Sequence, residues 1–272
     1  MLTTLSIRDL QPQLAANRRY WTGLAGAGGA DNPDADLPIY RTGVGDSLMN
    51  GVLRVRGVPL DDALAVAREQ LQGTKWAWWV SADSDEGTAE GLLARGATQA
   101  ALMPIMALDI ERAALGAPAD LTSAPADLKI RTITDAAEMA DYVGVFAAPL
   151  GITSDLDLIV ERELGFGLGN LDVVRRAAFV DGRMVSTCTL SLGAEVAALY
   201  AIATAPDFRR RGIATALTLD ALRIARTAGR RIATLQASKA GEPVYRRIGF
   251  QTVAQYLLFS FADQPADPGA ED

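Results

Sequence analysis

The chain has 272 residues, of which 49% are hydrophobic and 22% are charged, and its formal net charge is -7 at pH 7. This is the composition of a soluble globular protein, and the length allows one large domain or two small ones. The net acidity excludes a general binder of nucleic acid or of anionic membranes, because both need a broad basic face. We therefore expect no nucleic-acid partner and no membrane partner.

The residue counts also restrict the chemistry. The sequence has no histidine, which excludes Ser-His-Asp and Cys-His catalysis and nearly all catalytic zinc sites. One cysteine, Cys188, allows neither an intrachain disulfide nor a thiolate zinc cluster, and in a strand-like run it is typical of a small buried hydrophobe. We predict no metal, so any proton transfer depends on Glu, Asp, Tyr, Lys, Cys or water.

The first twenty residues do not resemble a secretory signal. They carry Arg8, Asp9, Arg18 and Arg19 and lack the apolar core that a signal peptide needs. No apolar run along the chain approaches the roughly 20 residues that span a bilayer. These features predict a cytoplasmic protein.

The elements of the N-terminal half alternate between strand and helix patterns. In chain order they are a strand at "GVLRVRG" (51–57), a helix at "DDALAVAREQL" (61–71), a strand at "KWAWWVS" (75–81), a helix at "GTAEGLLARG" (87–96) and a strand at "ATQAALMPIMALDI" (97–110). The tryptophans Trp76, Trp78 and Trp79 favour core packing, although they could also wall an acceptor pocket or a domain interface.

An Ala- and Pro-rich stretch, "ERAALGAPADLTSAPAD" (111–127), predicts a linker, or the end of a helix followed by a linker. We place a boundary near residue 120, which gives an N-terminal domain over 1–120 and a second domain over 121–262. The acidic, turn-rich end of the chain, "ADQPADPGAED", predicts a disordered tail over 263–272.

The second half continues with an α/β pattern. A strand (128–134) precedes a helix with Asp135 as its cap and a second helix (156–167), and then two strands flank an Asp181-Gly182 hairpin turn. The remaining segments are a buried central strand (195–205), a helix from Ile213 to Gly229, a strand (230–238), a short helix (242–249) and a final strand (250–261). The order β-α-α-β-β-β-α-β-α-β predicts an α/β domain with a mixed sheet.

The N-terminal half repeats the end of this plan. Its strand-helix-strand-helix-strand order is that of 196–261, and Gly96 matches Gly249 after the second helix of each copy. This similarity indicates a duplicated fold. The alternative is that any α/β chain alternates in this way.

The turn at "PDFRRRGIA" (206–214) concentrates positive charge where a strand ends and a helix begins. A helix start exposes unpaired N–H groups and the positive end of the helix dipole, and a glycine there lets a ligand approach the main chain. The three arginines add charge and forked donors. The turn is therefore interpreted as a phosphate-binding site of a polyanionic cofactor, with a solvated surface cluster as the alternative.

With this turn and a second motif after it, the sequence resembles the GNAT superfamily of acyl-CoA-dependent N-acetyltransferases. The family motif Q/R-x-x-G-x-G/A appears as "RRRGIA" (209–214), and "SKAGEPVYRRIGF" resembles the second motif, with Tyr245, Gly249 and Phe250 at its marker positions. The resemblance covers about residues 128–262. The N-terminal half resembles the degenerate copy found in tandem GNAT proteins, so we expect two GNAT-like domains in tandem.

The resemblance implies an acetyl-CoA site between the fourth and fifth strands of the second domain, which splay apart after a bulge. The main chain of Ala201, Ile202, Ala203 and Thr204 would pair with the pantetheine arm. The diphosphate would lie on the turn formed by Arg209, Arg210, Arg211, Gly212, Ile213 and Ala214. Ser238 stands where many members have asparagine, so this coenzyme contact is weakened or replaced.

The resemblance also implies direct attack of an amine on the thioester. Tyr245 matches the family tyrosine, whose phenol is suited to protonate the departing thiolate as a general acid. The family's carboxylate base would fall near Ala198, which cannot serve. Glu195, Tyr200, Glu242 and a chain of waters remain open, and the base is left unassigned.

The N-terminal copy lacks the features of a coenzyme site. At the matching turn, "RGVPLDD" (56–62), Pro59 has no N–H, the carboxylates of Asp61 and Asp62 would repel a phosphate, and Leu92 stands in place of the tyrosine. We therefore expect this copy not to bind coenzyme.

The resemblance favours an acetyl-CoA-dependent N-acetyltransferase that acts on the amine of a small molecule, as a monomer or homodimer. Two alternatives stay open. One is a non-catalytic acyl-CoA-binding sensor or scaffold, and the other is a protein or peptide N-acetyltransferase with an open groove.

Overall fold

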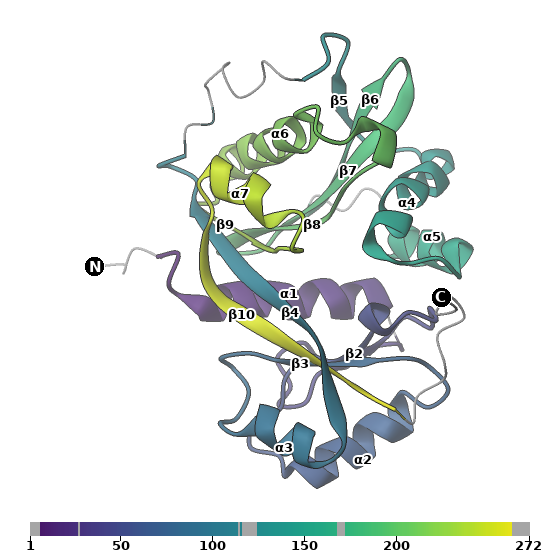
Figure 1. The fold of residues 1–272 in the computed structure, drawn as a ribbon, viewed down its shortest axis with the longest axis vertical. Helices are drawn as coiled ribbons and strands as arrows, with labels where there is room; N and C mark the ends of the chain where they lie inside the picture. The colour runs from purple at the N-terminus through teal and green to yellow at the C-terminus, as the bar shows by residue number, and fades with distance from the viewer. Residues whose placement is uncertain (1–5, 27, 114, 116–123, 168–171, 263–272) are drawn as a thin grey trace. The chain divides into compact units, whose positions relative to one another are not determined.

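The computed structural model describes residues 6–26, 28–113, 115, 124–167 and 172–262. The chain folds into two compact units (Figure 1). Unit 1 comprises Met1–Ala16, Pro104–Ile152 and Gly167–Val253, and unit 2 comprises Asn17–Met103, Thr153–Phe166 and Ala254–Asp272. The units are not consecutive halves of the sequence.

Six neighbouring strands of a mixed sheet form the centre of unit 1. Its order is β4-β9-β8-β7-β6-β5, with bounds β4 (Ala97–Asp109, which enters unit 1 at Pro104), β5 (Lys129–Thr132), β6 (Val173–Val180), β7 (Arg183–Leu192), β8 (Val196–Thr204) and β9 (Ile232–Gln236). Strands β8 and β9 are parallel, and the other neighbours are antiparallel. Asp181 and Gly182 both have positive φ, as a two-residue hairpin turn of this kind requires.

Helices cover the sheet of unit 1. They are α4 (Met139–Ala147), α6 (Ile213–Thr227), α7 (Glu242–Ile248) and the short 3-10 segments η3 (Ala136–Glu138), η4 (Ala148–Leu150) and η5 (Pro206–Phe208). Helix α6 contacts α7 and packs on β7 and β8 (Figure 1). Its buried face includes Ile213, Leu217 and Ala221, as the helical spacing predicts, and it stops before Gly229, which has φ +77.

Unit 2 contains the strand order β1-β2-β3-β10. Its elements are β1 (Ile39–Arg41), β2 (Asn50–Val52), β3 (Ala77–Val80), β10 (Gln251–Phe261, which enters unit 2 at Ala254), η1 (Ser47–Met49), α2 (Leu60–Gln70), α3 (Thr88–Ala94), α5 (Leu156–Gly165) and the second part of α1 (Leu10–Ala25). Strands β2 and β3 are parallel, and β3 pairs antiparallel with β10.

The three clustered tryptophans belong to the core of unit 2. Trp76 and Trp78 lie in one cluster with Phe261, whereas Trp79 contacts Tyr256 with ring centroids 5.1 Å apart. All three are at most 4% exposed. Core packing, the interpretation favoured from the sequence, is therefore confirmed.

The predicted fold class, α/β with a mixed sheet, is confirmed, and each predicted strand and helix is present. Most are shorter than predicted, whereas β2 and α2 begin one residue earlier than expected. Helix α1 and strand β1 were not predicted. The expected domain boundary near residue 120 and the expected tail at 263–272 lie outside the described residues, so both stay predictions.

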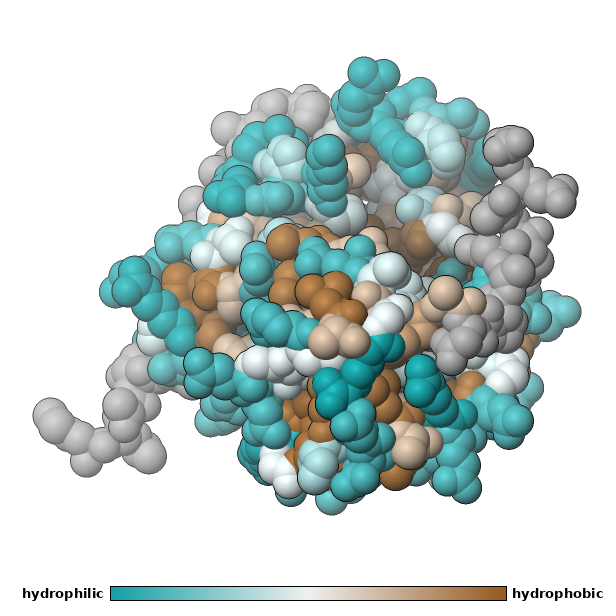
Figure 2. Space-filling view, turned by 60° about the horizontal axis from the view of Figure 1, so that its bottom comes forward, coloured by the Kyte–Doolittle hydropathy of each residue, from teal (hydrophilic) through white to brown (hydrophobic). Residues whose placement is uncertain are grey.

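On the face drawn in Figure 2, apolar areas are separate and lie among hydrophilic residues. Large hydrophobic side chains with high exposure include Leu93 and Leu102. None of the described helices combines the length and hydrophobicity needed to cross a bilayer.

Candidate active site

Strand β8 of unit 1 has an open edge at its carboxyl end. Its parallel pairing with β9 ends at Leu199 and Leu235, although β8 continues to Thr204. On its other side, β8 stays paired with β7, but Ala201 and Ile202 together oppose one β7 residue, Cys188. This bulge lies just beyond Leu199, where the two parallel strands separate. The main-chain groups of β8 after that point therefore have no partner on β9.

The chain then enters α6 through a turn with unusual backbone conformation. Gly212 is the N-cap residue with φ +70, and Arg210 also has positive φ, at 60. Left-handed residues in a turn orient successive N–H groups toward one side, and the first N–H groups of a helix have no partner within the helix. The start of α6 therefore presents unpaired N–H donors, which is a geometry that can accept an anion.

A cavity of about 780 Å³ joins the open edge of β8 to this turn and to α7. Predicted site residues that line it are Ile202, Ala203, Thr204, Arg209, Arg210, Gly212, Ile213, Ala214, Ser238 and Tyr245. Of the predicted set, Ala201 and Arg211 do not line it. Ala201 forms the bulge, and the guanidinium of Arg211 lies 5.2 Å from the ring centroid of Phe208. The structure thus brings the predicted residues together, and their roles stay predictions.

The charge on the cavity wall is of one sign. Arg209, Arg210 and Arg247 line it, and among the described lining residues there is no Asp or Glu. Arg209 is fixed by its Nε, which donates to the carbonyl oxygen of Thr204 at 3.1 Å. Three guanidinium groups without a carboxylate favour a ligand with several negative charges.

Tyr245 is held at the inner side of α7. Its ring packs edge-on against Phe250, with centroids 6.0 Å apart, and a Cβ at Gly241 would stand 3.0 Å from its Cε2. Burial, with a smaller contribution from Cys188, raises the pKa of the phenol above its ordinary value near 10. The side chain is therefore protonated at neutral pH and can donate a proton or hydrogen bond into the cavity that it lines.

Ser238 begins the turn into α7. Its Oγ accepts a hydrogen bond from the main-chain N–H of Gly241 at 3.1 Å, and its carbonyl accepts from Glu242. The serine thus stabilises the turn, and it also lines the cavity.

The residues considered as general base lie outside the cavity lining. Glu195 is exposed and precedes β8, at the end opposite to the bulge. Tyr200 is 7% exposed, and Glu242 accepts hydrogen bonds from Arg246 at 2.6 and 2.8 Å. The base stays unassigned.

Several cavity residues were not predicted from the sequence. Val244, Arg247 and Ile248 lie on the same side of α7 as Tyr245, and Pro149 and Leu150 come from η4. The helical spacing from Tyr245 to Ile248 is a signal that could have identified this face of α7. The sequence carries no such signal for the η4 residues, because they come from a distant part of the chain.

A second and larger cavity in unit 1, about 950 Å³, lies beside α4 and the β6–β7 hairpin. It carries charges of both signs, and Arg131 in its wall pairs with Glu138. Neither Tyr245 nor Gly212 lines it. We therefore place the candidate active site in the smaller cavity, which joins the turn at the start of α6 to the protonated phenol of Tyr245.

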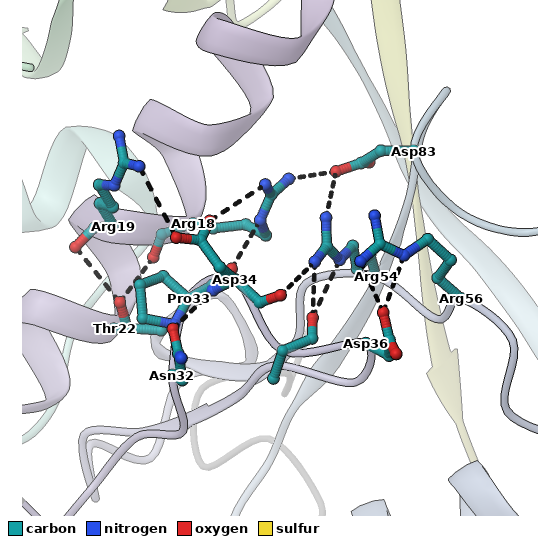
Figure 3. Close-up of polar contacts among 11 residues, drawn as sticks. Arg18, Arg19, Thr22, Asn32, Pro33, Asp34, Asp36, Arg54, Arg56 and Asp83 are labelled. Atoms are coloured by element: carbon teal, nitrogen blue, oxygen red, sulfur yellow. Dashed lines mark hydrogen bonds and ion pairs between the residues drawn. The ribbon is translucent and has the colours of Figure 1, made fainter. Parts of the chain in front are cut away.

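The matching place in unit 2 is filled by the protein. After β2, Arg54 is 3% exposed, and its Nη2 donates to the carbonyl oxygens of Asp34 and Ala35, each at 2.7 Å (Figure 3). Its Nη1 lies 3.8 Å from Asp83, which follows β3 and also pairs with Arg18. Burial raises the pKa of Asp83, while the two guanidinium groups act in the opposite direction.

Hydrogen bonds of Asp85, from its main chain and its side chain, close the same place in unit 2. The Asp85 N–H donates to the carbonyl of Val55 at 2.9 Å, and the Asp85 carboxylate accepts from Gly57 N–H at 2.7 Å. Helix α2 begins after Pro59 with Asp61 and Asp62 in its first turn, and Leu92 is fully buried. These contacts agree with the expectation that the N-terminal copy binds no coenzyme, which stays a prediction.

Residues 156–250 match the model of the acetyltransferase (GNAT) family. The chain therefore contains a domain of this family, and the family supports acyl transfer as the class of reaction. A search of curated proteins finds no match.

Solved structures of GNAT proteins share the fold of nearly the whole chain. A GCN5-related N-acetyltransferase from Kribbella flavida has a TM-score of 0.67 at 16% identity, over 91% of this chain and 94% of that chain. One from Sphaerobacter thermophilus has a TM-score of 0.61 at 18% identity, over 94% and 95%. A tandem GNAT protein from the clavulanic acid biosynthesis pathway has a TM-score of 0.59 at 15% identity, over 85% and 79%. The predicted tandem GNAT fold is confirmed.

Proposed function

We propose, on the premise that residues 156–250 form a domain of the GNAT acetyltransferase family, that this domain transfers an acetyl group from acetyl-CoA to the amine of a small molecule. One observation carries the proposal. The cavity beside the open edge of β8 combines a helix start, three arginines and a buried tyrosine. An anion at one end and a reacting thioester at the other would use all of these features.

The turn into α6 would bind the diphosphate. The N–H groups from Arg210 to Ala214 supply main-chain donors, and the guanidinium groups of Arg209 and Arg210 supply charge-assisted hydrogen bonds. The open edge of β8 from Ile202 to Thr204 would take the amide groups of the pantetheine arm, because such groups can replace the missing β9 partner.

Tyr245 would act at the reacting end. The lone pair of the amine attacks the carbonyl carbon, the carbon–sulfur bond breaks, and sulfur leaves with the bonding electrons. The phenol of Tyr245, whose raised pKa keeps it protonated, would give its proton to that sulfur. The proton lost by the amine passes to a base that we do not assign.

The net charge of the chain supports a cationic acceptor. A formal charge of -7 attracts amines, which are positively charged at neutral pH. An amine must lose its proton before it attacks, so the same charge would favour binding but not reaction. We propose a small molecule as the acceptor, and its identity is the first object of the test.

The test is release of free thiol from acetyl-CoA in the presence of a library of amines. The protein contributes little thiol signal, because its one cysteine, Cys188, is buried. Release with small amines supports the proposal. Acetyl-CoA that stabilises the protein against heat but releases no thiol with any amine supports a sensor, and release with peptides alone supports a peptide acetyltransferase.

Gly212 provides a direct test of the phosphate turn. Gly212→Glu places a carboxylate at the start of α6 and strains a residue with φ +70, so binding of acetyl-CoA should be lost in calorimetry. Gly212→Gln is the matched control, because it has the same size and the same backbone strain without the charge. Retention of most of the affinity in the Gln variant and its loss in the Glu variant is the expected pair of results. Equal affinity in both variants would contradict an anion site at this turn.

A further inference from the structure

The bulge in β8 contains a residue in an unfavourable conformation. Ala201 has φ +47, in the left-handed region that glycine adopts readily and alanine does not. The register places it where the pairing with β7 shifts, between Thr187 opposite Ala203 and Thr189 opposite Tyr200. The alanine therefore adopts this conformation only because surrounding contacts fix it.

Two hydroxyl groups of β7 supply such contacts. The Oγ1 of Thr187 donates to the carbonyl oxygen of Ala201 at 2.8 Å, and the Oγ of Ser186 donates to the carbonyl of Ala203 at 2.6 Å. Ser186 Oγ also lies 2.9 Å from Oγ1 of Thr204. Both Ser186 and Thr187 are fully buried. Because both hydroxyl groups are buried, their hydrogen bonds to main-chain oxygens of β8 fix the backbone conformation of that strand at the bulge.

The fixed segment forms the wall of the cavity. Ile202, Ala203 and Thr204 line it, and they follow Ala201 directly. A rotation at Ala201 would change the direction of the N–H and C=O groups after it. The hydroxyl groups on β7 and the cavity on the other side of β8 are therefore linked through the conformation of one residue.

We propose that Thr187, assisted by Ser186, is a positioning residue for the acyl-CoA site, and this inference rests on the proposed function. The Thr187 hydroxyl holds the Ala201 carbonyl, keeps the bulge in its left-handed conformation, and so aims the main chain of 202–204 at the acyl-CoA arm. Thr187 does not line the cavity. Its effect on the reaction is indirect and is specific for the acyl donor.

The experiment compares steady-state kinetics of the full chain and of Thr187→Val, which removes the hydroxyl and keeps the shape of the side chain. Loss of one hydrogen bond predicts an increase of about threefold to tenfold in KM for acetyl-CoA. The KM for the amine should stay within about twofold of the wild-type value, because one bond should affect only the donor site. Thr187→Ser, which keeps the hydroxyl, should restore the KM for acetyl-CoA.

A double-mutant cycle distinguishes positioning from general destabilisation. Ala201→Gly adopts positive φ without strain, so it should reduce the effect of Thr187→Val on KM to about twofold or less. The matched control is Thr234→Val on β9, which removes another buried hydroxyl bond, to Gln13 at 3.0 Å. It should leave the KM for acetyl-CoA unchanged.

The outcomes separate this inference from the proposed function. A wild-type protein that neither binds acetyl-CoA nor releases thiol overturns both. An active wild-type protein with an unchanged KM in Thr187→Val, or an increase that Ala201→Gly does not reduce, overturns the role of Thr187 alone. If Thr187→Val is not recovered folded, Ser186→Ala takes its place with the same expected rise in KM, and no rise overturns the inference.

Discussion

The two units carry the same sequence of elements around a parallel pair of strands, but one pair opens and the other is closed. In unit 1, β8 and β9 lose contact after Leu199, and a cavity follows. In unit 2, the segments after β2 and β3 stay joined by the hydrogen bonds of Asp85 and by the buried pair of Arg54 and Asp83 (Figure 3).

The open pair and the closed pair differ at the start of the following helix and in the direction of their arginines. The open pair has a glycine with positive φ before its helix and arginines on the cavity wall. The closed pair has Pro59 at that helix start, and its arginine, Arg54, is turned inward toward carbonyl oxygens and a carboxylate. Positive charge thus faces a cavity in unit 1, where we propose that it binds an anion, and faces internal partners in unit 2.

The largest expected effect is the loss of turnover when Tyr245, whose counterpart in unit 2 is Leu92, is replaced. Tyr245→Phe removes the proton donor but keeps the ring against Phe250, so thiol release should fall about 100-fold to 10,000-fold. The affinity for acetyl-CoA, measured by calorimetry, should not change, because the phosphate turn is intact.

The dependence of turnover on pH provides a second test of Tyr245. Because burial raises the pKa of Tyr245, its deprotonation should not reduce turnover between neutral pH and about pH 10, the ordinary value for a phenol. Unchanged turnover in Tyr245→Phe would show that Tyr245 is not the proton donor. Unit 1 would then resemble unit 2, which has Leu92 and no proton donor at this position.

A second effect concerns the closed pair. Asp83→Asn keeps the shape of the side chain but leaves Arg18 and Arg54 buried without their carboxylate, which should destabilise the protein by about 3 to 5 kcal/mol in denaturant unfolding. Because the proposed coenzyme site lies in unit 1, the affinity for acetyl-CoA of the folded variant should not change.

Asp36→Asn is the control for Asp83→Asn. Asp36 pairs with Arg56 at 2.7 Å, but both side chains are more than half exposed, so the change should be below about 1 kcal/mol. Similar losses of unfolding free energy in Asp83→Asn and Asp36→Asn would show that the buried cluster of Arg18, Arg54 and Asp83 stabilises unit 2 no more than an exposed ion pair does.

The order of elements could be predicted because most segments alternate or repeat clearly. Helix α6 shows this best, since its apolar residues recur at helical spacing between Gly212 and Gly229. Helix α1 was not predicted because its buried face includes the polar residues Gln13, Asn17 and Arg18, which interrupt the hydrophobic pattern.

The predicted site residues came from local motifs, and the missed features depend on tertiary contacts. The left-handed conformation of Ala201 cannot be read from an alanine in an apolar strand, because it depends on a register shift against β7. The pairing of Arg54 with Asp83 likewise joins two segments with no local signal. Sequence patterns thus identify where a ligand can bind, whereas contacts between strands decide whether the place is open.

The smallest effect concerns Arg247, which was missed by the sequence analysis and lines the cavity with no carboxylate near it among the described lining residues. Arg247→Ala should raise the KM for acetyl-CoA by about threefold to tenfold, because an exposed guanidinium contributes a modest charge-assisted contact. Arg246→Ala is the matched control, since Arg246 is the neighbouring residue but pairs with Glu242 and does not line the cavity. Because the contribution is electrostatic, the difference between the two variants should shrink as salt is added. An equal KM in both variants at low salt would mean that Arg247 makes no contribution to coenzyme binding, and that the positive charge that matters lies at the turn before α6.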